Sequence, residues 1–181
     1  GLDVLSLDRA HSQDIRELHI GLLNMMPDAA LQATERQFLR LVTSCNRIAQ
    51  FYVHPISVPG LERQGEVGEY VAQFYEEPDA VLSAGLDALI ISGANPVHAD
   101  IREEPYWDAL YDIMQWANDN VTSTMCSCLA THAHIAQTHG VERTPLRDKQ
   151  WGVYSHRVLD ANHPLTANIN TRFDAPHSRW N

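Results

Sequence analysis

The sequence predicts an α/β protein with a mostly parallel sheet and helices on both faces. The chain has 181 residues, of which 44% are hydrophobic and 20% charged, a globular composition with enough apolar material for a substantial core. Short apolar runs that suit buried strands alternate along the chain with longer segments of helical periodicity. Alternation of this kind is typical of parallel sheets, because each crossover between parallel strands needs a helix-sized connection.

The first half of the chain predicts two strands with a helix between them. An apolar run over residues 18–24 reads as a buried strand that stops at Met-Met-Pro. A helix follows from Asp28, its expected N-cap, to Ser44, with apolar residues at helical spacing. A second strand is expected over 48–58, a charged loop over 60–68, and a short helix around 71–75.

The second half continues the same alternation. Residues 86–92 (LDALIIS) form the clearest buried strand, which ends at Gly93. The further elements expected are a helix over 105–118, a β-branched strand over 121–127, a helix over 129–138 closed by Gly140, and a strand over 152–159. In parallel sheets, functional residues gather at the carboxyl ends of strands, so we expect a functional site at the residues that follow positions 92 and 127.

Charge and cysteine content narrow the functional classes. Lys and Arg number 13 against 23 Asp and Glu, a net charge of −10, which disfavours nonspecific binding to nucleic acid or anionic membranes. No apolar run reaches the roughly 20 residues that span a bilayer. The first residues show no apolar signal core, and the three cysteines lack the spacing of a disulfide framework. We therefore expect a cytoplasmic protein.

Cys128 is the strongest candidate for chemistry, because it falls between a predicted strand and the next helix. The backbone N–H groups that begin a helix are unpaired and carry partial positive charge. They stabilise a thiolate and can hold the oxyanion that forms when the thiolate attacks a carbonyl. A strand–Cys–helix turn is thus the thiol counterpart of a nucleophile elbow.

Two other interpretations of this segment stay open. Cys126 and Cys128 could both be small buried hydrophobic residues. With His132 and His134 they also form C-x-C-x3-H-x-H, whose residue types suit zinc. Histidines two apart on a helix do not share a face, so no metal site is expected.

The strand end at Gly93 would lie beside Cys128 if the two strands are neighbours. Glycine allows backbone to approach a ligand closely. The backbone amides of Ala94 and Leu129 could then form an oxyanion hole. The alternative is an ordinary Gly-Pro turn after a strand.

Several blocks of the sequence together resemble the homoserine O-succinyltransferase and O-acetyltransferase family. The resemblance runs in order from about Asp14 to Arg179. Its blocks are residues 22–27 (LLNMMP), 34–41 (TERQFLRL), 88–94 (ALIISGA), 106–107 (YW) with Trp116 and 121–124 (VTST), Cys128 at the nucleophile turn, 149–156 (KQWGVYSH) and 175–179 (APHSR).

The resemblance implies a class I glutamine amidotransferase-like, flavodoxin-like fold and a ping-pong acyl transfer. The family moves a succinyl or acetyl group from coenzyme A to the hydroxyl of L-homoserine, early in methionine synthesis. By position, Cys128 would carry the thioester, Lys149 and Ser178 would bind substrate with Arg179 beside them, and Val97 would influence the choice of acyl-CoA. Without the resemblance, Lys149 reads as a surface charge and Arg179 as a tail residue.

The same resemblance implies partners and co-substrates. The expected ligands are L-homoserine and succinyl-CoA or acetyl-CoA, with no bound cofactor, no metal, no nucleic acid and no membrane. Members of the family often pair, so a homodimer is conceivable, although no heptad or apolar stripe in the sequence indicates one.

The chain also departs from the family pattern. Leu129 and His132 replace the usual Trp and Gln, and Asp28 begins the segment where the family has a basic pair. The family's catalytic His and Glu belong to a block beyond Asn181, so we expect residues 1–181 to be a single acyltransferase domain that is incomplete at its C-terminus. The alternatives are a different hydroxyl acceptor, another amidotransferase-like cysteine hydrolase, or an inactive binding protein. If the chain were complete, its base would come from His132, His156 or His177.

Overall fold

The computed structural model describes residues 6–12, 15–46 and 49–180. These fall into two compact units, residues 1–142 and 143–181, each of which is described by itself. No helix in the described ranges is long and apolar enough to cross a membrane.

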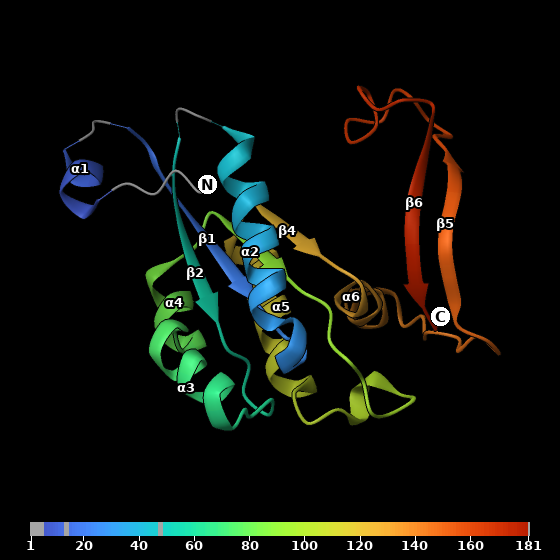
Figure 1. Ribbon diagram of the computed structural model, residues 1–181, viewed down its shortest axis with the longest axis horizontal. Coiled ribbons are helices and arrows are strands. Elements are labelled where there is room, and N and C mark those ends of the chain that lie inside the picture. The colour runs from blue at the N-terminus through green and yellow to red at the C-terminus, as the bar shows by residue number, and fades with distance from the viewer. Residues whose placement is uncertain (1–5, 13–14, 47–48, 181) are drawn as a thin grey trace. The chain divides into compact units, whose positions relative to one another are not determined.

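The first unit contains a four-stranded sheet in the order β2-β1-β3-β4 (Figure 1). Every pairing in it is parallel, which confirms the predicted fold class. The strands are β1 (Glu17–Leu23), β2 (Gln50–Ile56), β3 (Ala88–Ile91) and β4 (Ser123–Cys126). Because β3 and β4 are neighbours, the two strand ends singled out from the sequence meet at one edge of the sheet.

Helices connect the strands and cover the sheet. They are α1 (Leu7–His11), α2 (Asp28–Cys45), α3 (Gly65–Phe74), α4 (Pro78–Ala84), the 3-10 helix η1 (Ile101–Glu103), α5 (Trp107–Asn120) and α6 (Leu129–His139). The helix α6 ends at Gly140, whose φ of 64° is the left-handed C-cap conformation, as the sequence predicted.

The core lies on both faces of this sheet, because alternate strand residues point to opposite sides. On one face, Ile20, Leu22 and Ile90 pack with Val42 of α2. The larger cluster on the other face joins strand residues to α5 and α6, and its central members are Leu23, Leu89, Ile91, Leu110, Met114 and Ala133. Helices on both faces were the arrangement expected for a parallel sheet.

Some local predictions were wrong. Asp28 is the first residue of α2 rather than its N-cap, which is Pro27 in extended conformation. The reason is that the Asp28 carboxylate pairs with Arg63 instead of capping the helix. The helix α3 begins at Gly65, inside the expected loop 60–68, although glycines disfavour a helix there. Its Tyr70 hydroxyl donates a hydrogen bond to Glu35 of α2, a contact that the sequence pattern does not show.

The second unit is an antiparallel pair of strands, β5 (Gln150–Arg157) and β6 (Arg172–Arg179). The strand expected over 152–159 corresponds to β5, shifted by two residues. The strand β6 was not predicted, although it contains the last block of the family resemblance. Parallel pairing therefore applies to the first unit, whereas this unit has a separate two-stranded sheet.

Candidate active site

Cys128 occupies a sharp turn between β4 and α6. It is the N-cap of α6, with φ 55° and ψ −118°, and its side chain is exposed. Within the described ranges it is the one non-glycine residue with positive φ. Such a conformation costs on the order of 1–3 kcal/mol and persists only where the surrounding structure holds it. The local geometry is therefore the strand–Cys–helix turn that the sequence predicted.

Backbone hydrogen bonds hold both sides of this turn. The Ser127 N–H donates to the Ile91 carbonyl at 2.9 Å, which extends the contact between β3 and β4. On the helical side, Thr131 donates its N–H to the Cys128 carbonyl and its hydroxyl to the Cys126 carbonyl, each at 3.0 Å. These bonds leave the thiol of Cys128 at the N-terminus of α6.

Gly93 lies directly against this turn. A Cβ atom at Gly93 would lie 2.9 Å from Cys128 Cβ, 3.3 Å from its Sγ and 3.7 Å from the Leu129 backbone nitrogen. A separation of 2.9 Å is shorter than real Cβ contacts, so the close approach requires glycine. The structure thus brings the two predicted strand ends into contact.

Ala94 and Leu129 flank the contact between Gly93 and Cys128. Both are buried, Ala94 immediately after Gly93 and Leu129 as the first residue of α6. The N–H groups in the first turn of a helix have no partner within the helix. Both residues thus lie next to the Gly93–Cys128 contact, and the role of their backbone amides as an oxyanion hole stays a prediction.

Cys126 differs from Cys128 in its surroundings. It is half-buried at the end of β4, and burial raises the pKa of its thiol. A raised pKa lowers the thiolate fraction at neutral pH, and the thiolate is the nucleophile. Of the two cysteines, exposed Cys128 is therefore the better candidate for chemistry.

The loop after β3 carries Val97 and is held by a residue that the sequence analysis missed. Val97 is 86% exposed, whereas Glu104 is buried. One oxygen of Glu104, Oε1, accepts the backbone N–H groups of both Val97 and His98 at 2.6 Å. The sequence carries no local signal for this contact, because Glu104 accepts N–H groups of the preceding loop rather than those of the helix that follows.

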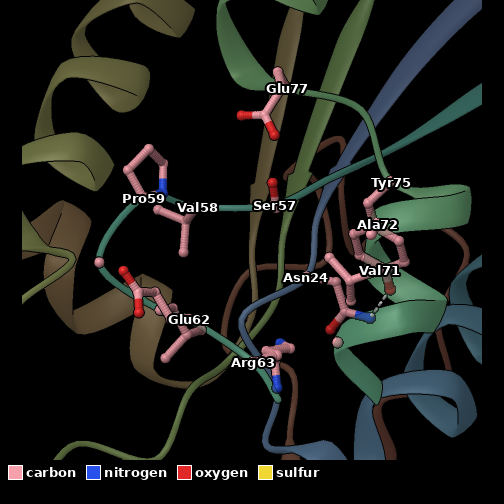
Figure 2. A pocket seen from close by; sticks show the side chains of 13 residues that line it. Asn24, Ser57, Val58, Pro59, Glu62, Arg63, Val71, Ala72, Tyr75 and Glu77 are labelled. Carbon is pink, nitrogen blue, oxygen red and sulfur yellow. Dashed lines mark hydrogen bonds between the residues drawn. The ribbon is translucent and has the colours of Figure 1, made fainter. Parts of the chain in front are cut away.

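A cavity of about 480 Å³ opens near the ends of β1 and β2 (Figure 2). Its lining mixes polar and apolar side chains, drawn in Figure 2 from Asn24, the loop after β2, and α3. Arg63 is almost fully buried, pairs with Asp28 and donates to the Met26 carbonyl at 2.5 Å. Sequence reasoning did not single out Arg63, because it sits in a charged loop with no motif.

In the second unit, the hairpin brings three predicted substrate residues to one end. Gln150 pairs with Arg179 in the register, and Ser178 lies opposite Trp151. The Arg179 Nε donates to Gln150 Oε1 at 3.0 Å, and Lys149 Nζ lies 4.6 Å from the centroid of a Trp151 ring. Lys149, Ser178 and Arg179 are thus neighbours on this unit, whereas Cys128 belongs to the first unit.

Two of the candidate histidine bases also meet in the hairpin. The Nε2 atoms of His156 and His177 lie 3.1 Å apart. Burial, followed by the charges of Arg179 and His156, lowers the pKa of His177. A lowered pKa favours the neutral imidazole, the form that accepts a proton. The third candidate, His132, lies on α6 in the first unit.

Comparison with known proteins decides the family. A family model described as homoserine O-succinyltransferase matches residues 1–181. The chain belongs to the homoserine O-succinyltransferase family. Over all 181 residues it is 58% identical to a protein named homoserine O-succinyltransferase in Methylobacter tundripaludum, 58% identical to one in Methylococcus capsulatus and 56% identical to one in Cardiobacterium hominis.

These alignments cover 100% of the chain and 51%, 51% and 52% of the three relatives. The chain thus spans about half the length of the homoserine O-succinyltransferases that it matches. The family assignment applies to both units, because the matched residues run through the parallel sheet and the hairpin alike.

Within this homoserine O-succinyltransferase family member, the described residues contain no group of three His, Cys, Asp or Glu side chains that could hold a metal ion. The C-x-C-x3-H-x-H spacing is divided by the turn at Cys128, which puts Cys126 on β4 and the two histidines on α6. The geometry at Cys128 is that of a thiol at a helix N-terminus.

Proposed function

We propose that this protein transfers an acyl group from acyl-CoA to the hydroxyl of L-homoserine through a thioester on Cys128, in the cytoplasm and as a step of methionine biosynthesis. Membership of the homoserine O-succinyltransferase family supports the reaction class. The observation that carries the proposal is the strained, exposed Cys128 at the start of α6, packed against Gly93.

In the first half-reaction, the Cys128 thiolate attacks the thioester carbonyl of acyl-CoA. A bond forms between Sγ and the carbonyl carbon, and the carbonyl oxygen becomes an oxyanion. We assign the backbone N–H groups of Ala94 and Leu129 to hold this oxyanion. When it collapses, coenzyme A leaves as a thiolate and takes up a proton, and the acyl group remains on Cys128.

In the second half-reaction, the hydroxyl of L-homoserine attacks the acyl-enzyme. The hydroxyl loses its proton to a general base, and the acyl–sulfur bond breaks, so that O-acylhomoserine leaves and the Cys128 thiol is restored. Lys149, Ser178 and Arg179 are proposed to bind substrate, because cationic and hydroxyl groups hydrogen-bond to a carboxylate. The candidate bases among the described residues are His132 on α6 and His156 and His177 on the hairpin.

The proposed donor is succinyl-CoA rather than acetyl-CoA. The relatives that the chain matches are named homoserine O-succinyltransferases, which supports this choice. Val97, at the position that the family resemblance links to donor choice, is highly exposed on the loop after β3 and is free of packing that would bury it. The proposed co-substrate needs no resident metal or prosthetic group.

An intact mass spectrum of the native protein, taken after brief exposure to succinyl-CoA or acetyl-CoA, tests the proposal. A covalent acyl-enzyme would add about 100 Da for succinyl or about 42 Da for acetyl, and L-homoserine would remove it. Cys128→Ser should abolish the adduct, and the matched variant Cys126→Ser should retain it. An adduct that survives in Cys128→Ser but not in Cys126→Ser would show that Cys126, and not Cys128, is the nucleophile. If neither donor gives an adduct, the alternative of a binding protein without catalytic activity is favoured.

A further inference from the structure

A series of hydrogen bonds, partly buried at its start, begins where Tyr70 of α3 contacts Glu35 of α2. The buried carboxylate of Glu35, on α2, accepts a hydrogen bond from Tyr70 at 2.8 Å and one from Tyr75 at 2.9 Å. The Tyr75 hydroxyl also accepts a hydrogen bond from Asn24 Nδ2 at 2.9 Å, the dashed line in Figure 2. These contacts lead from α2 to Asn24, directly after β1.

The series continues from Asn24 to the strand end beside Cys128. Asn24 Oδ1 lies 3.3 Å from the hydroxyl of Ser92, which has no solvent exposure. That hydroxyl accepts the Met25 N–H at 2.8 Å and lies 3.0 Å from the Gly93 carbonyl oxygen. Its one proton can go to Asn24 or to Gly93. Ser92 thus ties the end of β1 to the end of β3.

The last contact in the series, between Gly93 and Cys128, is steric and not a hydrogen bond. Gly93 packs so closely on Cys128 that a Cβ atom would collide with it. Cys128 in turn holds a backbone conformation that needs support from its neighbours. A shift of Gly93 would therefore let the Cys128 turn relax and move the thiol away from the N–H groups that begin α6.

We propose that Ser92 and Asn24 are positioning residues that hold Gly93 against Cys128 and so keep its thiol at the N-terminus of α6. The proposal rests on the proposed role of Cys128 as the nucleophile. Neither residue touches the reacting atoms. Their effect is on the reactivity of the thiol, since the N–H groups that begin a helix favour the attacking thiolate only while the sulfur lies beside them.

The test measures the rate at which iodoacetamide alkylates Cys128 at about neutral pH, resolved from Cys126 by peptide mass spectrometry. We expect Ser92→Ala to slow the alkylation of Cys128 about tenfold. Ser92→Thr keeps the hydroxyl and should restore much of the original rate.

A matched pair of tyrosine variants separates positioning from general stability. Tyr75→Phe and Tyr70→Phe each remove one hydrogen bond to Glu35, but only the Tyr75 hydroxyl also contacts Asn24. Tyr75→Phe should slow the alkylation of Cys128, by less than Ser92→Ala does. Tyr70→Phe should leave it unchanged.

Half-buried Cys126 reports on folding in the same experiment, because an unfolded chain would expose it. If Ser92→Ala makes Cys126 reactive, that variant is unfolded and Tyr75→Phe is used in its place. An unchanged rate of Cys128 alkylation in the folded variant would overturn the proposal. Slower alkylation of Cys128 in the variant, combined with no acyl adduct on wild-type protein, would refute the proposed function and leave the positioning role standing.

Discussion

Cys128 and Cys126 are two residues apart, yet the fold gives them different chemical settings. Cys128 is exposed at a helix N-terminus, whereas burial raises the pKa of the Cys126 thiol. The contrast arises from the turn, which ends β4 at Cys126 and begins α6 one residue after Cys128. At the residue scale, the contact that matters most is the one between Gly93 and Cys128.

Gly93→Ala tests that contact. The added methyl group would meet Cys128 Cβ at 2.9 Å, so the turn must shift. We expect a loss of acyl-adduct formation of more than about tenfold and a drop of about 1–3 kcal/mol in the free energy of unfolding. Gly140→Ala is the control, because a Cβ there meets open space. It should cost only about 1 kcal/mol through its left-handed φ and leave adduct formation intact. Equal adduct formation in both variants would contradict the prediction.

At the scale of elements, a single carboxylate shapes the segment between β3 and α5. Glu104 is buried and accepts two adjacent backbone N–H groups through one oxygen. The preceding residue, Glu103, is exposed and lies 3.7 Å from His98 at the surface, a contact that is an ion pair only when the imidazole is protonated. The loop that carries Val97 is therefore fixed from inside the molecule rather than from its surface.

Glu104→Ala should lower the free energy of unfolding by about 1–3 kcal/mol, because it leaves the N–H groups of Val97 and His98 without their acceptor. The matched change Glu103→Ala removes only an exposed ion pair, which is worth about 0–1 kcal/mol. Urea denaturation of both variants measures the difference. Equal losses in the two would show that the buried carboxylate does not hold the loop.

The hydrogen bond between Tyr70 of α3 and Glu35 of α2 predicts that the protein loses stability at alkaline pH. Burial, with a hydrogen bond to Glu35, raises the pKa of Tyr70 from 10.0 to about 12. Because the folded pKa is the higher one, the stabilising effect is complete below pH 10 and declines as the pH rises through about 12. Stability measured by urea denaturation should fall across this window, and more gently in Tyr70→Phe. The tyrosinate absorbance should show a late-titrating group that this variant lacks, and an ordinary titration in wild type would refute the prediction.

At the scale of the whole molecule, the two units differ in how much core they possess. The first unit has apolar clusters on both sides of its sheet. The second is a two-stranded sheet whose large apolar side chains are mostly exposed, Trp151 at 71% and Val153 at 70%. Isolated two-stranded hairpins are marginal in water, because they bury too little apolar surface to offset the entropy of ordering.

A peptide of residues 143–181 should therefore lack a cooperative unfolding transition. Its circular dichroism should be that of a largely unfolded chain and change gradually with temperature. Residues 1–142, measured in parallel, should unfold in a single sigmoidal step, since that unit contains the parallel sheet and its core. A sharp transition in the shorter peptide would contradict this account.

The sequence by itself determined the class of fold and the position of the candidate nucleophile. Apolar runs such as 86–92 mark parallel strands because both faces of such strands are buried. The placement of Cys128 between a strand and a helix followed from the same periodicity, and the family followed from blocks in register. Short helices without clear periodicity, such as α4, escaped prediction because their residues gain little from local preferences.

Tertiary structure alone decided which distant residues meet. Arg63 and Ser92 act through contacts with residues far away in the sequence, and no local pattern states that a serine will join two strand ends. Glu104 acts within its own loop, but no local pattern states that its carboxylate will be buried and accept two amides of that loop. The close approach of Gly93 to Cys128 likewise depends on β3 lying next to β4. Sequence periodicity reports the direction in which each side chain points, whereas strand order and packing select its partners.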